Sequence, residues 1–224
     1  MFDRIAGFYD RMNTVMTAGL HHRWRERAAD LAAVRAGSSA LDVATGTGDL
    51  AIALAARVGP GGEVIGTDFS ERMLELARAK AASAGLGRLR FEPGNALSLP
   101  YEDGRFDAAT VGFGARNFSD LERGLRELAR VVRPGGHVVV LEITTPTRPP
   151  LSRFFELWFD RAVPALGRLA GDPEAYSYLP SSVRRFPGAS ALAALMWRAG
   201  MHDVRYVLTA GGIIALHVGV VAER

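Results

Sequence analysis

The residues that point most directly to chemistry form a glycine loop, Thr45-Gly46-Thr47-Gly48, which follows a short apolar run. Glycine has no Cβ, so the backbone at Gly46 and Gly48 can turn tightly and lie close to a ligand. Asp68 ends the next apolar run, twenty residues after Gly48. An acidic residue at this position can accept hydrogen bonds from both hydroxyl groups of a ribose. The pattern therefore predicts a ligand that contains a nucleoside.

Two ligand classes fit this loop. The spacing Gly46-x-Gly48-x-x-Ala51 matches a dinucleotide fingerprint, which leaves an NAD(P)-dependent oxidoreductase open. Asp49 argues against it, because a pyrophosphate would dock at this helix start and two negative charges would meet. Asp42 and Asp49 flank the loop and suit a cationic ligand instead. We therefore favour the sulfonium donor S-adenosylmethionine, with a plain tight turn as the remaining alternative.

Asn95 and Ala96 follow the third apolar run. Asn95 can hydrogen-bond the edge of an adenine ring, but Pro93-Gly94-Asn95 is also ordinary turn chemistry, and both interpretations stay open. The residues expected to bind the cofactor are Asp42, Thr45, Gly46, Thr47, Gly48, Asp68, Phe69, Asn95, Ala96 and Gly112.

Strands alternating with helices must position these residues. Expected strands are 39–44, 63–67, 89–92, 106–111 and 137–143, and expected helices lie in 1–36, 49–58, 70–83, 119–132 and 189–199, with Ser70 and Ser119 as N-caps. This alternation predicts a parallel sheet with right-handed crossovers. Two last strands, 202–208 and 213–221, are joined by a short glycine turn and form an antiparallel pair. The expected fold class is α/β with a seven-stranded, mostly parallel sheet. With the sulfonium donor favoured above, we expect a Rossmann-like class I methyltransferase.

One domain over residues 1–224 is expected, with an N-terminal helical lid (about 1–36) and a helical substrate cap (about 148–186). The cap segment carries apolar side chains at roughly helical spacing, which either pack in the core or line a groove. These residues are Leu151, Phe154, Phe155, Leu157, Trp158, Phe159, Val163 and Leu166, accompanied by Arg148, Arg153, Arg161 and Arg168.

Composition narrows the function classes. The chain has 224 residues, 48% of them hydrophobic, and no cysteine, which excludes disulfides, thiolate metal sites and a cysteine nucleophile. We expect no metal, no signal peptide, no spanning helix and a cytoplasmic location. The net charge of +3 comes almost entirely from arginine, with Lys80 the only lysine. The sequence has no basic stripe interleaved with aromatic residues, so it does not indicate a nucleic-acid partner. Attraction to an anionic membrane surface stays open as an explanation of the positive charge.

Several longer motifs resemble the ubiquinone/menaquinone biosynthesis C-methyltransferases, the family of demethylmenaquinone methyltransferase. The matching blocks are Phe2-Asp3-Arg4-Ile5-Ala6, Tyr9-Asp10-x-Met12-Asn13, His22-x-Trp24-Arg25, the segments 41–49, 66–74 and 106–117 with Gly112-Phe113-Gly114-x-Arg116-Asn117, and later Tyr178-Leu179-Pro180-x-Ser182-Val183, Phe186-Pro187-Gly188 and Gly211-Gly212-x-x-Ala215-x-His217-x-Gly219. The resemblance covers nearly the whole chain. It departs at Ala115 and at Ile143-Thr144-Thr145, where the family has other residues, and both positions border the expected cleft.

The resemblance implies methyl transfer to a ring carbon of a prenylated hydroquinone, either demethylmenaquinol or the corresponding ubiquinone precursor. It also implies cofactor contacts at Thr47, Asp68, Asn95 and Ala96. Another lipophilic acceptor, or a non-catalytic binding subunit, is the alternative. Peripheral membrane contact and a homodimer are further expectations.

An aromatic carbon is a poor nucleophile, so catalysis needs a group that favours the ring phenolate and one that later accepts a proton. Arg116 is the candidate for stabilising the phenolate and Asn117 for orienting its oxygen. Alternatively, Arg116 is a surface residue that pairs with Asp120. Tyr9 either covers the cleft or packs in a helix. His22, like His217, is either a proton acceptor or a structural histidine.

Overall fold

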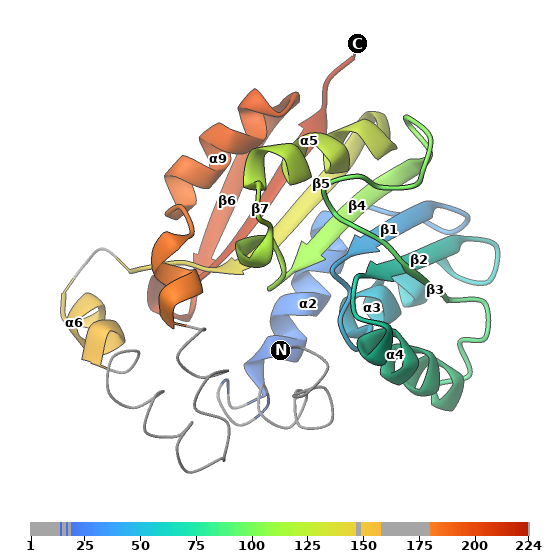
Figure 1. Cartoon of the computed structure of the whole chain (residues 1–224), viewed down its shortest axis with the longest axis horizontal. Helices are drawn as coiled ribbons and strands as arrows, with labels where there is room; N and C mark the ends of the chain where they lie inside the picture. The colour runs from blue at the N-terminus through green and yellow to red at the C-terminus, as the bar shows by residue number, and fades with distance from the viewer. Residues whose placement is uncertain (1–13, 15–16, 18, 147–148, 158–179, 224) are drawn as a thin grey trace.

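The computed structural model describes residues 14, 17, 19–146, 149–157 and 180–223. Its centre is a single sheet in the order β3-β2-β1-β4-β5-β7-β6 (Figure 1). The strands are β1 (Ser39–Val43), β2 (Glu63–Asp68), β3 (Arg90–Pro93), β4 (Phe106–Gly112), β5 (Val132–Ile143), β6 (Met201–Thr209) and β7 (Ile214–Val221). The helices are α2 (Leu20–Leu31), α3 (Asp49–Val58), α4 (Glu71–Ser83), α5 (Leu121–Val131), α6 (Leu151–Leu157) and α9 (Ala189–Arg198).

Strands β1 to β5 pair in parallel, and β7 runs antiparallel to both β5 and β6. The expected seven-stranded sheet with an antiparallel terminal pair is therefore confirmed. A short 3-10 turn, Ala210–Gly212, joins the last two strands. It stands where the sequence predicts a glycine turn.

Helices cover both faces of the sheet (Figure 1). Side chains of α2, α3 and α4 belong to one buried cluster with Val139 and Leu141 of β5, whereas those of α5 and α9 belong to a second cluster with Val138 and Val140. Successive strand residues point to opposite faces, so a strand buried on both sides must be apolar throughout. This explains why the central segment of β5, Val138–Leu141, shows no alternation of polar and apolar residues.

The order of the strands creates a crevice at the centre of the sheet. β1 and β4 are neighbours, but the chain leaves β1 toward β2 and β3 on one side and leaves β4 toward β5 on the other. The connections that follow β1 and β4 therefore diverge at their carboxyl ends. Ligands bind at such a switch point in open α/β sheets.

Several element boundaries differ from expectation. The expected helix over 1–36 is interrupted among the described residues, because Gly19 (φ 76°) and Ala33 (φ 53°) take left-handed conformations on either side of α2. β5 begins at Val132 rather than His137, with a register irregularity opposite Phe106 and Ala108. Ser70 caps α4 as expected, accepting a hydrogen bond from the Met73 backbone N–H. The expected Ser119 cap is wrong, since Asp120 caps α5.

The described part of the cap segment rests on the carboxyl end of β5. Phe155 and Val183 are buried and pack against Ile143 and Ile213. A Cβ on Gly211 (φ 67°) would lie 2.2 Å from a methyl carbon of the Leu151 side chain. The Gly-Gly turn therefore leaves room for α6. Among the described residues, no helix is long and apolar enough to cross a membrane.

Candidate functional site

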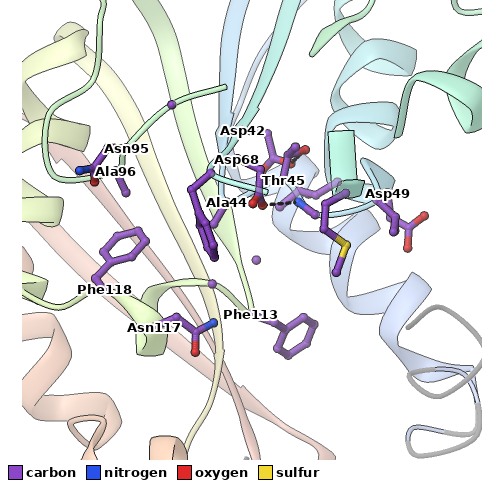
Figure 2. Close-up of a pocket in the computed structure, with 18 of the residues that line it drawn as sticks. Asp42, Ala44, Thr45, Asp49, Asp68, Asn95, Ala96, Phe113, Asn117 and Phe118 are labelled. Atoms are coloured by element: carbon purple, nitrogen blue, oxygen red, sulfur yellow. Dashed lines mark hydrogen bonds between the residues drawn. The ribbon is translucent and has the colours of Figure 1, made fainter. Parts of the chain in front are cut away.

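A cavity of about 330 Å³ opens at the carboxyl ends of β1 and β4 (Figure 2). It lies at the switch point of the sheet and is lined by loops that follow β1, β2, β3 and β4, together with α2. The lining residues are Arg25, Asp42, Ala44, Thr45, Gly46, Thr47, Asp49, Leu50, Asp68, Phe69, Met73, Gly94, Asn95, Ala96, Leu97, Gly112, Phe113, Gly114, Asn117, Phe118 and Ser119. Every residue that the sequence predicts to bind the cofactor is in this lining, except Gly48. The cofactor role of these residues stays a prediction.

The glycine loop owes its shape to left-handed backbone conformations. Gly46 (φ 56°) and Gly48 (φ 85°) take them without a steric penalty, and Gly48 is the N-cap residue of α3. A Cβ on Gly48 would also lie 2.8 Å from the Phe91 ring. Ala44 has φ 52°, which is unfavourable for a residue with a Cβ. The loop therefore holds backbone strain beside the cavity, as functional sites often do.

Asp42 lies beneath the loop, 1% exposed. Thr45 donates a hydrogen bond to its Oδ2 at 2.7 Å, and Thr110 of β4 donates one to its Oδ1 at 2.6 Å. Burial raises the pKa of Asp42 to about 6, although the two hydroxyl groups and Arg25 act in the opposite direction. The Asp42 carboxyl thus connects the glycine loop to β4. Above about pH 6 this carboxyl is ionised while buried, which lowers the stability of the folded protein.

Asp68 ties two loops together. Its Oδ2 accepts from the Gly46 backbone N–H at 2.9 Å (Figure 2), and its Oδ1 accepts from the Ser70 backbone N–H at 3.0 Å. The sequence predicts a role for Asp68 toward a ligand, and the bond to Gly46 adds a structural role. An ionised carboxylate has about four acceptor positions, so backbone bonds and ribose hydroxyl groups can share it.

One end of the cavity is neutral. Asn95 is exposed, and its Oδ1 accepts from the Leu97 backbone N–H at 2.9 Å, so the predicted turn is present. Phe69, with 69% of its surface exposed, and Phe118 add aromatic faces. A contact between Asn95 and adenine stays a prediction. The surroundings suit an uncharged ring system.

The other end of the cavity is charged. Asp49 accepts a hydrogen bond from the Lys80 ammonium at 2.6 Å, and its Oδ2 lies 3.7 Å from Nη1 of Arg25. Lys80 also donates to the Thr47 hydroxyl at 3.1 Å. Burial opposes ionisation of Asp49, but Arg25 and Lys80 outweigh it, so the pKa of this carboxyl is lowered. Asp49 is therefore negatively charged at neutral pH.

Arg25 itself is held on three sides. Its guanidinium contacts Nδ1 of His21, lies 5.4 Å from the centre of the Phe113 ring, and approaches Asp49. His21 is 2% exposed, and its Nε2 lies 3.1 Å from the Thr14 hydroxyl. His21, His22 and Asp49 also bring potential metal-ligand atoms within 4.8 Å of one another. Arg25 already provides a cation between His21 and Asp49, so this cluster does not need a metal to balance its charge.

The loop after β4 approaches the glycine loop closely. Phe113 has φ 60°, an outlying value for a bulky residue, and its ring borders the cavity. A Cβ on Gly114 would lie 2.5 Å from the Cβ of Ala44. The two loops can therefore meet only because Gly114 has no side chain.

Arg116 forms a buried ion pair, and the alternative in which it is a surface residue paired with Asp120 is wrong. Nη1 of Arg116 lies 2.8 Å from Oε1 of Glu142, whose side chain is 1% exposed. The guanidinium also donates to the Phe113 carbonyl oxygen, and the Arg116 backbone N–H donates to Glu142. Asp120, the expected alternative partner, instead accepts from the Arg123 backbone N–H as a helix cap. Arg116 is not in the cavity lining, whereas its neighbour Asn117 is.

The remaining predicted residues are less closely tied to the cavity. Tyr9 lies outside the described residues. His22 is exposed and absent from the lining. His217 is buried in β7, where its Nε2 donates to the Ala189 carbonyl oxygen at 2.8 Å, and burial lowers its pKa. The structural interpretation of His217 therefore holds.

Sequence reasoning assigned no role to four residues that shape the site: Arg25, Phe113, Phe118 and Glu142. Two signals were present. Arg25 and Phe113 stand inside the motifs that carry the family resemblance, and Glu142 is an acid at the end of an otherwise apolar strand. A buried acid requires a partner, so a cation nearby could have been expected. Phe118 gives no such signal.

Comparison with known proteins shows the family to which this chain belongs. Residues 1–221 match the model of the ubiE/COQ5 methyltransferase family. A demethylmenaquinone methyltransferase of Thermus thermophilus is 49% identical over 220 residues, covering 98% of this chain and 99% of that protein. The ubiquinone/menaquinone biosynthesis C-methyltransferase UbiE of Hahella chejuensis is 40% identical over 224 residues, covering 99% and 90%.

Solved structures are similar at the level of the fold. A SAM-dependent methyltransferase from Aquifex aeolicus aligns with a TM-score of 0.66 at 20% identity, covering 88% of this chain and 89% of that chain. The [4+2]-cyclase SpnF aligns with a TM-score of 0.67 at 20% identity, covering 91% and 81%. The fold therefore serves more than one chemistry, and the function must be argued from the site and the family.

We expect Asp42 to make stability depend on pH. Its pKa is about 6 when folded and 3.8 as a model value, so the folded state retains a proton that the unfolded state loses in this window. Stability from this group is therefore lost as pH rises from about 4 to above 6, by roughly 3 kcal/mol. In urea titrations of the ligand-free protein, Asp42→Asn should gain stability relative to wild type across this window. Parallel pH profiles for the two proteins would contradict the assignment.

Gly114→Ala should disturb the contact between the two loops. The added Cβ forces Ala44 or its backbone away, and overpacking of this kind costs about 1–3 kcal/mol. Urea unfolding should show this loss, and calorimetry should show weaker binding of S-adenosylhomocysteine. Gly61→Ala is the matched control, since nothing lies within 4 Å of a Cβ there. Equal behaviour of both variants would refute the proposed role of Gly114.

Proposed function

The chain belongs to the ubiE/COQ5 methyltransferase family, and on this premise we propose that it transfers a methyl group from S-adenosylmethionine to a ring carbon of a prenylated hydroquinone. The acceptor is demethylmenaquinol or the corresponding ubiquinone precursor, in keeping with the names of its relatives. The observation that carries the proposal is the family match over residues 1–221.

The charges of the cavity fit a cationic donor. Asp42, Asp49 and Asp68 line it, and Asp49 stands at the start of α3, where a dinucleotide would place a phosphate. We propose that Thr47, Asp68, Asn95, Ala96 and Gly112 hold S-adenosylmethionine. When bound, it supplies a methyl group already activated on a sulfonium.

The protein's main catalytic contribution is alignment. Holding two reactants in near-attack geometry is worth up to roughly 7–11 kcal/mol, and the activated methyl group needs no covalent intermediate. We place the acceptor ring against the turn that carries Arg116 and Asn117, because Asn117 lines the cavity beside Phe113. Asn117 orients a ring hydroxyl oxygen. Arg116 favours the phenolate form of that hydroxyl.

Glu142 fixes the direction of Arg116. The ion pair is largely buried, and Glu142 also accepts from the Ile143 backbone N–H at 2.8 Å. Glu142 is thus a positioning residue in the proposal. Tyr9 and His22 remain proposed members of the acceptor side, with His22 as one proton acceptor.

Wild-type protein should incorporate label from methyl-labelled S-adenosylmethionine into a demethylated naphthoquinol or benzoquinol with a short prenyl tail. The ratio of the two turnover rates identifies the acceptor class. Labelling of an unrelated lipophilic phenol, with neither quinol methylated, would favour the alternative acceptor. Binding of NAD(P)H in place of S-adenosylhomocysteine in calorimetry would remove the proposal altogether.

The catalytic turn is tested by a double variant. Removing Arg116 alone leaves the buried Glu142 carboxylate without its ion-pair partner, which typically lowers the free energy of unfolding by about 3–5 kcal/mol. Arg116→Gln with Glu142→Gln avoids this. We expect its kcat to fall about 100-fold or more while affinity for S-adenosylhomocysteine stays near wild type. Arg126→Gln, an exposed helix residue, serves as the control.

We also propose that the cap segment contacts a membrane surface at the cytoplasmic face. The described part exposes Leu157 (53%) together with Arg153, Arg184 and Arg185, which combines an apolar side chain with positive charge. An apolar face flanked by basic residues binds anionic interfaces reversibly. A polyprenyl tail could then pass between the bilayer and the site.

Vesicle co-sedimentation tests this contact. Wild-type protein should bind vesicles containing phosphatidylglycerol more than pure phosphatidylcholine, and salt should weaken the binding. Leu157→Ser with Arg153→Ser should reduce it. Absence of wild-type binding to anionic vesicles would remove the claim. The homodimer stays a prediction that analytical ultracentrifugation can check.

A further inference from the structure

The connection between β3 and β4, residues 94–105, forms one wall of the cavity and has little regular structure. Asn95, Ala96 and Leu97 line the cavity from its first turn. An isolated bridge pairs Asn95 with Ser98 within this connection. Backbone groups outside a helix or a sheet ladder must find hydrogen-bond partners elsewhere. The partners of this segment therefore decide how firmly the wall is held.

One side of α5 supplies these partners. Arg123, Glu127 and Arg130 are spaced four and three residues apart, so they lie along one side of the helix. Nε of Arg123 donates to the Leu97 carbonyl oxygen at 2.7 Å. Oε2 of Glu127 accepts from the Leu99 backbone N–H at 2.7 Å. The helix thus binds the connection through its backbone rather than through its side chains.

Arg130 makes the largest number of these bonds. Its guanidinium donates to the Leu99 carbonyl oxygen at 2.9 Å and to the Tyr101 carbonyl oxygen at 2.8 Å. It also pairs with Glu127 at 2.7 Å and with Asp103 at 2.8 Å. Hydrogen bonds to these carboxylates raise the pKa of Arg130, and the bond from Arg130 lowers the pKa of Glu127. Both residues are therefore charged at neutral pH.

Leu97 passes this restraint to the cavity. Its carbonyl oxygen is held by Arg123, and its own backbone N–H donates to Oδ1 of Asn95 at 2.9 Å. The Ser98 backbone N–H donates to the Asn95 carbonyl oxygen at 2.9 Å. A continuous chain of hydrogen bonds thus runs from α5 to the side chain of Asn95.

The same helix also seats the aromatic side chain next to this wall. A Cβ on Gly124 of α5 would lie 2.4 Å from the ring of Phe118, which lines the cavity. Glycine is unfavourable inside a helix. Its presence here leaves room for the Phe118 ring, so α5 shapes this end of the cavity in two ways.

We propose that Arg123, Glu127 and Arg130 are positioning residues, which fix the β3–β4 connection and thereby set the affinity for the cofactor without touching it. This inference rests on the proposed function. The three side chains are described and lie outside the cavity lining. A loosely held connection would have to become ordered when the cofactor binds, and this ordering weakens binding. The effect should therefore appear in KM and not in kcat.

The competing explanation is a set of surface ion pairs that only stabilises the fold. Arg130→Met removes the contacts with both carbonyl oxygens, and Arg130→Lys keeps the charge but loses the planar fork. Arg126→Met is the matched control, because Arg126 lies on the same helix with 56% of its side chain exposed. Val221→Ala controls for lost stability, since it opens a small core cavity in β7, away from the connection.

Amide hydrogen exchange of the ligand-free proteins measures how firmly the connection is held. Residues 94–105 should exchange faster in Arg130→Met than in wild type. KM for S-adenosylmethionine and the Kd for S-adenosylhomocysteine should rise about 10-fold, while kcat at saturating cofactor stays near wild type. Arg130→Lys should lie between the two. Arg126→Met and Val221→Ala should retain the wild-type affinity.

Several results would overturn the inference. Unchanged exchange would show that α5 does not hold the connection, and faster exchange with unchanged affinity would show a structural role only. A fall in kcat at unchanged KM would place the effect in the chemical step. Equal weakening in Val221→Ala would assign it to general loss of stability.

Two further arrangements keep the test decisive. If Arg130→Met does not fold, Arg123→Met removes the contact with Leu97 alone and should shift exchange and affinity in the same direction by less. Failure of the proposed function looks different, because wild-type protein would then not bind S-adenosylhomocysteine, whereas the exchange of residues 94–105 would still respond to Arg130→Met.

Discussion

Asp42 accepts hydrogen bonds from Thr45 and from Thr110, so one buried carboxylate joins the glycine loop to the strand beside it. This bond network sits where β1 and β4 part, and the cavity exists because the two strands are held together there while their loops diverge. Burial of the carboxylate is unfavourable at neutral pH, as its raised pKa indicates. The site therefore costs stability, and the large cores on both faces of the sheet compensate for it.

Much of the fold could be predicted from local sequence. Apolar runs mark the central strands β1, β4 and β7, because a strand buried on both faces needs apolar side chains on both. The edge strands β3 and β6 are more polar and largely exposed, so their sequences give a weaker signal. Boundaries were less predictable. Ser119 and Asp120 are both good capping residues one position apart, and only the path of the chain selects Asp120. Likewise, alanine is a good helix former, so the local sequence does not predict that Ala33 takes a left-handed conformation and that α2 ends before Gly37.

The site was predictable where the chain itself brings residues together. The glycine loop and Asp68 follow adjacent parallel strands, so their meeting follows from strand order alone. Arg25 reaches the same cavity from a helix that precedes β1, and Glu142 at the end of β5 contacts Arg116 in the turn that follows the neighbouring strand β4. These contacts depend on tertiary packing. The likeness to the [4+2]-cyclase SpnF underlines the point, because a shared fold leaves the chemistry to such side chains.

The single lysine of the chain has a practical consequence. Lys80 is held between Asp49 and Thr47 at the rim of the cofactor loop, and 30% of its side chain is exposed. A reagent selective for the ε-amine of lysine thus has one target in the whole sequence. Its rate of labelling would report directly on the state of that loop. The other residues counted as Lys or Arg are all arginine, whose guanidinium stays protonated and is not an ε-amine. Lys80 can therefore serve as a chemical reporter without any engineered residue.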